Sequence, residues 1–282
     1  MPLTDLLETT KPERIATGFQ FTEGPVWHPD GYLIFTDIPG DRIYRWWPDG
    51  RLETYREPSH NANGLTLDHG GCLIACEHGL RRVSRSEPGG PAVTIAGRYE
   101  GKRLNSPNDV VVQSDGSIYF TDPPFGLTSL EERELPFHGV FRLSPLGELT
   151  LLVDDFDRPN GLAFSPDKSI LYITDSWRYH VRSFDVCAEG TITNGRVFAE
   201  FDRNQGIGTP DGMKVDSEGN LYAIGPGGLW LMRADGSHVG LLRLPEWMSN
   251  CAWGDADRRT LYITGSTSLY RIRGKVMGIS PL

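Results

Sequence analysis

Six short phrases of related sequence recur along the chain, and each begins with a carboxylate or an amide side chain. These residues are Glu23, Asn63, Asn108, Asn160, Asp211 and Asn250. If the six meet, two carboxylates and four amides face one another without a lysine or an arginine among them. Buried carboxylates need a counter-charge. Oxygen ligands of this kind suit a hard divalent cation such as Ca²⁺, Mg²⁺ or Mn²⁺, so the set predicts a metal site.

The phrases begin 39 to 52 residues apart, and each leads into an apolar run, a turn and a second apolar run. In the third copy the runs are 110–112 and 117–121, with the turn Ser114-Asp115-Gly116 between them. Apolar β-branched and aromatic residues on either side of such a turn are typical of a β-hairpin. A repeat of roughly 40–50 residues built from short strands indicates a propeller.

Strand-like runs also lie between the hairpins, so each repeat unit has about four antiparallel strands. Six such units predict an all-β chain folded as a six-bladed β-propeller around a central channel. Because a single blade cannot bury its own apolar faces, we expect residues 1–282 to form a single β-propeller domain, with 1–13 as an N-terminal extension. Only one strand, 269–273, follows the sixth hairpin. The N-terminal segment 14–19 is expected to pair with it and close the ring without an open edge.

The innermost strand of each propeller blade lines the channel, so equivalent residues of the six blades form a ring around the axis. The six polar residues are therefore expected to converge. Asparagine or aspartate before glycine is also a common turn signal, and one copy alone would favour a structural role. Six copies in register favour a site. For Asn63 and Asn250 the alternative is that they hold ordered water or anchor neighbouring ligands.

A second set of acids is expected near the first. Fourteen or fifteen residues after the ring positions of the first four copies lie Asp37, Glu77, Asp122 and Asp175, at the ends of the returning strands. Residues placed symmetrically about a hairpin turn lie side by side, so these acids should share one mouth of the channel. They would either orient the ligands or bind nearby backbone N–H groups.

Composition narrows the class of protein. The net charge is −9 and no basic run is present, which disfavours binding to nucleic acid or to an anionic membrane. The apolar runs are too short to span a bilayer, and no signal peptide is evident. Cys72 and Cys76 lie four residues apart on one expected strand, too far for a disulfide, and a reduced, cytoplasmic setting is the simpler reading. The motifs of serine hydrolases, zinc proteases and nucleotide-binding loops are absent from the sequence.

Four segments, taken in order, resemble the gluconolactonase and regucalcin (senescence marker protein) family of six-bladed propellers. They are 21–27 (FTEGPVW), 104–110 (LNSPNDV), 158–165 (RPNGLAFS) and 210–213 (PDGM). The resemblance implies one divalent metal ion, Ca²⁺ first and Mg²⁺, Mn²⁺, Zn²⁺ or Fe²⁺ as alternatives. Its ligands would be Glu23, Asn108, Asn160 and Asp211. Regucalcin carries an arginine near the second ligand, whereas Ser106 occupies that region here, so its sugar contacts do not transfer.

The resemblance also implies hydrolysis of an aldonolactone, such as glucono-1,5-lactone or xylonolactone, to the aldonic acid. Asp211 is the expected general base, with Asp122 or Asp175 as the alternative. Asn108 would bind either the metal or the substrate. Ser106, Asp122 and His138 are expected to bind sugar hydroxyls, although a loop histidine is also a common solvated residue. Trp177 would either pack against the sugar or serve the fold.

Two other functions fit the same residues. A Lewis acid serves a phosphoryl oxygen as well as a carbonyl, so a phosphotriesterase-like hydrolase is the first alternative. The second is a non-catalytic propeller that carries a structural calcium ion and binds other proteins, because a fold does not determine a function.

Overall fold

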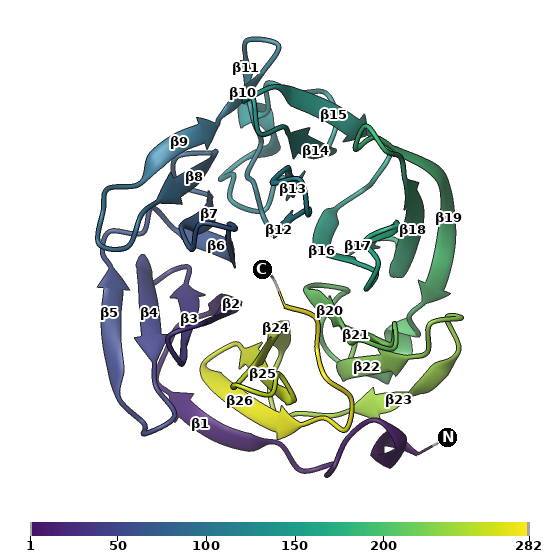
Figure 1. The fold of residues 1–282 in the computed structure, drawn as a ribbon. Coiled ribbons are helices and arrows are strands. Elements are labelled where there is room, and N and C mark those ends of the chain that lie inside the picture. The colour runs from purple at the N-terminus through teal and green to yellow at the C-terminus, as the bar shows by residue number, and fades with distance from the viewer. Residues whose placement is uncertain (1, 281–282) are drawn as a thin grey trace.

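The computed structural model describes residues 2–280, and within them six blades surround a central channel (Figure 1). Each blade is a four-stranded antiparallel sheet, so the predicted all-β, six-bladed propeller is confirmed. In five blades the strands follow one another from the channel outward in chain order. Each inner pair of strands corresponds to one hairpin of the sequence repeat.

The strand bounds are as follows for the first three blades: β2 Thr22–His28, β3 Tyr32–Asp37, β4 Arg42–Trp46 and β5 Leu52–Arg56; β6 Ala62–Leu67, β7 Leu73–Glu77, β8 Arg82–Ser86 and β9 Val93–Ala96; β12 Val110–Val112, β13 Ile118–Asp122, β14 Gly139–Leu143 and β15 Leu149–Val153. The next two blades contain β16 Pro159–Phe164, β17 Ile170–Asp175, β18 His180–Val186 and β19 Ile192–Glu200; β20 Met213–Val215, β21 Leu221–Gly225, β22 Gly228–Met232 and β23 His238–Leu242. The sixth contains β24 Met248–Gly254, β25 Thr260–Gly265, β26 Ser268–Arg273 and β1 Glu13–Thr17.

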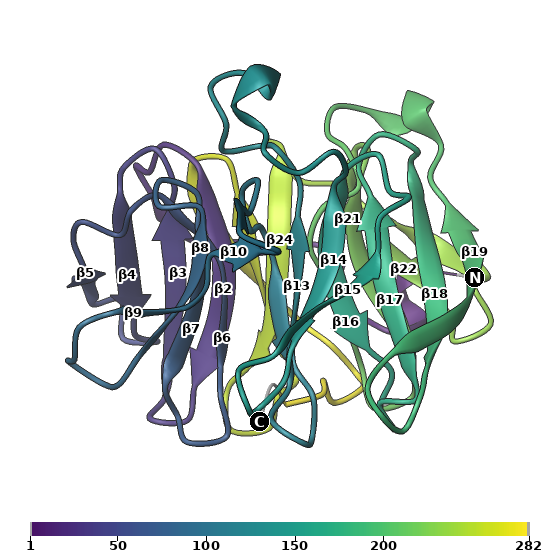
Figure 2. The same ribbon diagram turned by 90° about the horizontal axis from the view of Figure 1, so that it is seen from above.

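A small hairpin and three single-turn 3-10 helices complete the described elements. They are β10 Arg98–Tyr99 with β11 Lys102–Arg103, η1 Leu3–Asp5, η2 Leu130–Glu132 and η3 Arg203–Gln205. Figure 2 shows η2 (teal) and η3 (green) rising from one face of the ring, while the segment after β26 lies at the opposite face.

The ring closes through the two ends of the chain. Strand β1 is the outer strand of the sixth blade and pairs with β26, with Glu13 opposite Arg271 and Thr17 opposite Ser268. The expected closure by N- and C-terminal strands is therefore confirmed. The residues before β1 also contribute to the core, because Leu6 and Leu7 are buried in an apolar cluster with residues of the last two blades.

The apolar core is divided among the gaps between blades. Residues 2–280 form six buried clusters, one between each pair of neighbouring blades. In the gap between the sixth and first blades, for example, Tyr262 packs with Leu33 and Phe35. Both faces of every blade are therefore apolar, which is why each blade needs both neighbours.

The inner strands approach closely because glycine follows the ring residue in four of the six phrases. A Cβ atom on Gly64 would lie 2.5 Å from the backbone oxygen of Asn108 in the next blade, and one on Gly161 would lie 2.4 Å from that of Asp211. Neither approach is sterically possible for a larger residue. Asn63-Gly64 and Asn160-Gly161 thus belong to the inner strands β6 and β16 rather than to turns, and their glycines allow the neighbouring blades to approach closely.

The end of the channel away from η2 and η3 is covered by the segment after β26, which runs toward the axis (Figure 1). Ser217 N donates to Met277 O at 2.8 Å, and Gly278 N donates to Arg258 O at 2.8 Å. Within residues 2–280 no helix is long and apolar enough to cross a membrane. The four cysteines are unpaired.

Candidate metal and substrate site

The six ring residues are all buried. Four of them lie in the innermost strands β2, β6, β16 and β24, whereas Asn108 and Asp211 lie just before β12 and β20. The structure thus brings together all six positions that the repeat singled out.

Five of the six line a cavity of about 340 Å³; they are Glu23, Asn63, Asn108, Asn160 and Asp211. Asn250 is not among the lining residues and lies behind Glu23, where its Nδ2 donates to Glu23 Oε2 at 3.0 Å. The rest of the lining comes from the loops that follow β3, β7, β13 and β17 and from those that precede β2, β20 and β24. The loop after β13 carries η2, and the loop before β20 carries η3, so the cavity opens toward that face.

Hydrogen bonds determine how the amides are turned. Asn160 Nδ2 donates to Ser176 Oγ at 3.1 Å, which leaves its Oδ1 as the free acceptor. Asn250 Oδ1 accepts from Cys251 N at 2.8 Å, so its amide nitrogen must face Glu23. Asn63 Nδ2 lies 3.2 Å from His78 Nε2, while the Oδ1 of Asn63 is buried without a hydrogen-bond partner.

In the hairpins β2–β3 and β16–β17 the pairing differs from the symmetric register that the sequence suggested. The ladder shifts between Glu23 and Val26, so Asp37 lies opposite Thr22 and not opposite Glu23. The same shift places Asp175 opposite Pro159 rather than Asn160. A shift of one residue moves a side chain to the other face of a strand, which accounts for the positions of Asp37 and Asp175 outside the cavity. Among residues 2–280, none of the four acids lines it.

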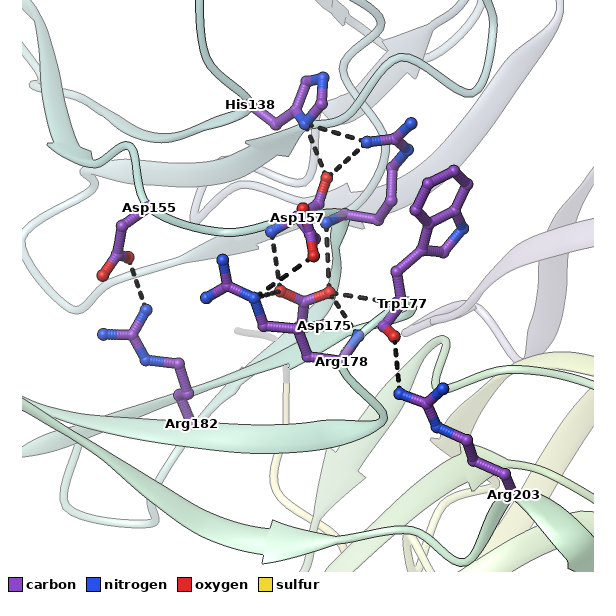
Figure 3. Close-up of polar contacts among 9 residues, drawn as sticks. His138, Asp155, Asp157, Asp175, Trp177, Arg178, Arg182 and Arg203 are labelled. Atoms are coloured by element: carbon purple, nitrogen blue, oxygen red, sulfur yellow. Dashed lines mark hydrogen bonds and ion pairs between the residues drawn. The ribbon is translucent and has the colours of Figure 1, made fainter.

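These acids bind the loops instead. Asp37 accepts from the backbone N–H groups of Gln20 and Phe21 at 3.0 and 2.9 Å. Asp122 accepts from Asn105 N and Ser106 N, both at 2.7 Å. Figure 3 shows the carboxylate of Asp175 at the centre of a similar group of contacts, which includes Trp177 N and Arg178 N, both at 3.1 Å.

Glu77, the fourth acid, is fully buried and forms ion pairs with Arg56 and Arg82 at 3.1 and 2.6 Å. Of the two roles expected for the second set, three of its members take the backbone role and Glu77 takes an ionic one.

Ser106, Asp122 and His138, which were expected to bind substrate, lie outside the set of residues that lines the cavity within 2–280. Ser106 Oγ accepts from Gly126 N at 2.9 Å, and His138 Nδ1 lies 2.6 Å from Asp157 O. These side chains hold the loops around the cavity in place. Trp177, in contrast, does line the cavity.

Two residues that sequence reasoning missed lie in the channel next to the ring. Asp109 is buried, and its Oδ2 lies 3.4 Å from Asn250 Nδ2 while its Oδ1 accepts from Val110 N at 2.9 Å. Lys214 attracts both Asp109 and Glu23. One signal for Asp109 was present in the sequence, because it occupies the position at which four other phrases have glycine.

The electrostatics of the site reflect its buried carboxyls. Burial, followed by repulsion from Asp109, raises the pKa of Glu23 to about 7. Burial, followed by repulsion from Glu23 and Asp109, raises the pKa of Asp211 well above its usual range. Lys214 partly offsets the charge of Asp109. A cation between Glu23 and Asp211 would favour their charged forms, because an opposite charge nearby lowers the pKa of a carboxyl.

The donor set fits a divalent cation. Glu23 and Asp211 offer carboxylate oxygens, Asn160 and Asn63 offer amide oxygens, and the Oδ1 of Asn63 lacks a donor. No lysine or arginine is among the residues that line the cavity within 2–280. In the same part of the chain no three His, Cys, Asp or Glu side chains form a metal-binding group, so amide oxygens would have to complete the coordination. Such a set suits a hard ion.

Fold and site together define a six-bladed β-propeller with an oxygen-lined site at one mouth of its channel. Residues 21–267 match the model of the family described as SMP-30/Gluconolactonase/LRE-like region. The chain belongs to this family, as its sequence motifs predicted.

The relatives include a gluconolactonase of Zymomonas mobilis, which is 36% identical over 98% of this chain and 85% of its own length. Among solved structures, a provisionally assigned gluconolactonase is 39% identical with a TM-score of 0.89, covering 96% of this chain and 94% of that one. A gluconolactonase from Xanthomonas campestris is 36% identical with a TM-score of 0.86, covering 93% and 88%. The expectation of an enzyme is confirmed.

Proposed function

We propose that this protein hydrolyses a sugar lactone, an aldonolactone such as glucono-1,5-lactone or xylonolactone, in a reaction that depends on one divalent metal ion. The observation that carries the proposal is the meeting of two buried carboxylates, Glu23 and Asp211, with amide oxygens at the wall of a 340 Å³ cavity. The gluconolactonase relatives support the choice of a lactone.

Glu23, Asn160 and Asp211 would hold the ion, with Asn108 as a fourth ligand or as a donor to the substrate. Ca²⁺ is our first choice because the proposed ligands are all oxygens. When bound, such an ion polarises the lactone carbonyl and lowers the pKa of a coordinated water.

The chain itself contributes orientation and proton transfer. Asn250 fixes the carboxylate of Glu23 through its amide nitrogen, and Ser176 fixes the amide of Asn160. Asp211 is the base that we propose for the attacking water, because its carboxylate lines the cavity beside the other proposed ligands. Asp122 and Asp175 are poorer candidates because their oxygens accept backbone N–H groups outside the cavity.

The test is acid release from glucono-1,5-lactone and xylonolactone by chelator-treated enzyme, before and after addition of Ca²⁺, Mg²⁺, Mn²⁺, Zn²⁺ or Fe²⁺. We expect acid release above the spontaneous rate only after metal is added. A phosphotriester assayed on the same sample separates the alternative hydrolase from the lactonase. No acceleration of lactone hydrolysis with any of the metals would refute the proposal.

Two variants test the residues. Glu23→Gln and Asp211→Asn should abolish turnover while the fold persists, because each removes a proposed carboxylate ligand. Asp216→Asn is the matched control, since Asp216 is a buried acid bonded to Asn220 away from the cavity. Near-normal activity of Glu23→Gln in the presence of metal would rule out this metal site.

A further inference from the structure

Three large aromatic side chains surround the opening of the cavity. Phe125, Trp177 and Trp247 all line it, and we call them the aromatic collar. Their exposed fractions are 42%, 54% and 39%. Aromatic rings that gather at a cavity and stay exposed are typical of a binding site, because leaving them in water is unfavourable.

Trp177 is held firmly in place. The guanidinium carbon of Arg158 lies 3.8 Å from the centre of the indole, and Arg158 Nη1 donates to Asp157 O at 2.7 Å. The backbone of Trp177 is fixed on both sides, since its N–H donates to Asp175 and its carbonyl accepts from Arg203 at 3.1 Å (Figure 3). A ring fixed in this way presents a preformed apolar surface, so a ligand need not spend binding energy to order it.

Trp247 is fixed by a different set of contacts. Its ring meets Phe21 edge to face, with the ring centres 6.3 Å apart, and its carbonyl accepts from Ser266 N at 2.7 Å. Phe21 also lines the cavity, together with Ile38 and Pro39. The apolar wall therefore continues inward from the collar.

The cavity offers few polar partners outside the ring. The remaining polar lining residues are His78, Ser176 and Thr209. His78 Nε2 already contacts Asn63 at 3.2 Å, and Ser176 Oγ donates to Pro210 O at 2.6 Å. Outside the ring, the lining therefore offers more apolar surface than polar partners, which favours a ligand with an apolar part.

From this lining we infer that the site also hydrolyses lactones whose ring bears an apolar substituent, an alkyl chain or an aryl group, which packs against the collar. The inference rests on the proposed lactonase function and extends it to a second substrate class. In the reaction the oxygen of water bonds to the carbonyl carbon, and the bond from that carbon to the ring oxygen breaks. The ring oxygen takes a proton and becomes a hydroxyl, and the new carboxylic acid releases a proton to solvent.

The test compares three lactones on the metal-loaded enzyme by acid release. They are δ-valerolactone, δ-decalactone, which has the same ring with a pentyl chain, and glucono-1,5-lactone. We expect kcat/KM for δ-decalactone to exceed that for δ-valerolactone by about tenfold, which corresponds to burying roughly two methylene groups against the collar.

Trp247→Ala and Phe125→Ala should each bring the ratio of the two kcat/KM values toward one, while Trp247→Phe should retain most of it. Leu146→Ala is the matched control, because Leu146 is 96% exposed in the turn between β14 and β15 and does not line the cavity. Quenching of tryptophan fluorescence by 5-hydroxydecanoate, the hydrolysis product, gives a readout that does not depend on turnover, and Trp247→Ala should weaken it.

The outcomes separate the two proposals. Turnover of glucono-1,5-lactone and δ-valerolactone with no preference for δ-decalactone would overturn the inference and leave the lactonase function standing. Equal losses on both δ-lactones in the collar variants would also overturn it. No turnover of any lactone with any metal would overturn both.

Discussion

Asn250 offers a sharp test of how the site is built. It lines no part of the cavity, yet its amide nitrogen donates to Glu23 Oε2 at 3.0 Å and lies 3.4 Å from Asp109 Oδ2. Replacing it with alanine removes both contacts and leaves the proposed ligands unchanged. We expect Asn250→Ala to weaken metal binding because Glu23 is then free to turn away from the cavity.

The size of the effect follows from the bond that is lost. A hydrogen bond to a charged group contributes about 1.5–3 kcal/mol. At about 1.4 kcal/mol per factor of ten, the apparent metal affinity should fall by about 10- to 100-fold, which is also the range seen when a residue that orients a metal ligand is removed. The free energy of unfolding should fall by about 1–3 kcal/mol, since Cys251 N loses its acceptor at 2.8 Å.

Isothermal titration of chelator-treated protein with Ca²⁺ and with Mn²⁺ measures the affinity. Asn220→Ala is the matched control: Asn220 is a buried asparagine whose Nδ2 donates to a carboxylate, Asp216, at 2.8 Å away from the cavity. It should lose similar stability and keep its metal affinity. Wild-type affinity in Asn250→Ala, or an equal loss of affinity in Asn220→Ala, would refute the reasoning.

Three further predictions concern charge and packing. Metal affinity should fall as the pH drops below about 7, because the raised pKa values of Glu23 and Asp211 make protons compete with the metal. The fall should be about tenfold per pH unit for each proton that metal binding releases. Affinity that stays constant between pH 8 and pH 6 in the same titration would contradict this. Gly161→Ala should lower the free energy of unfolding by about 1–3 kcal/mol, because the added Cβ would be forced against Asp211 O. Denaturant unfolding measures this loss. The control Gly97→Ala should show little change, because its added Cβ would meet its nearest neighbour at 3.5 Å. Glu77→Ala should lower the free energy of unfolding by about 3–5 kcal/mol, because Arg56 and Arg82 would lose their buried partner. Glu53→Ala breaks an ion pair with Arg45 that is more than a third exposed, and should lower it by about 1 kcal/mol or less. Similar melting curves for the two variants would show that burial does not set the strength of these pairs.

The sequence repeat was enough to predict the architecture and the meeting of six polar residues. Blade number follows from counting phrases, and the inner position of each phrase follows from the order of strands in a propeller. The number of blades and the inner position of each phrase both follow from a local sequence pattern that recurs in every copy. The same argument predicts that Glu23, Asn108, Asn160 and Asp211 face one channel, and all four line the same cavity.

The surroundings of the ring were less predictable. Asp37 and Asp175 were expected beside the ring, but bulges near Glu23 and Asn160 shift the pairing of their hairpins, and loop N–H groups donate to both acids. The hairpin of Asp122 pairs without a shift, and its carboxylate also accepts from loop N–H groups. A bulge adds one unpaired residue to a strand, and the alternation of apolar residues in the repeat does not show where that residue falls.

The sequence by itself determined the fold, the number of blades and the residue types that face the channel, because these follow from periodicity and from the need to bury apolar faces. Only the tertiary structure decided that Lys214 approaches Asp109 and Glu23, that Asn250 stands behind the cavity and that Ser106 and His138 lie outside it. Phe125, Trp177 and Trp247 meet at one opening although 52 and 70 residues separate them along the chain. Such contacts arise between blades that are distant in sequence, and closure of the ring brings them together.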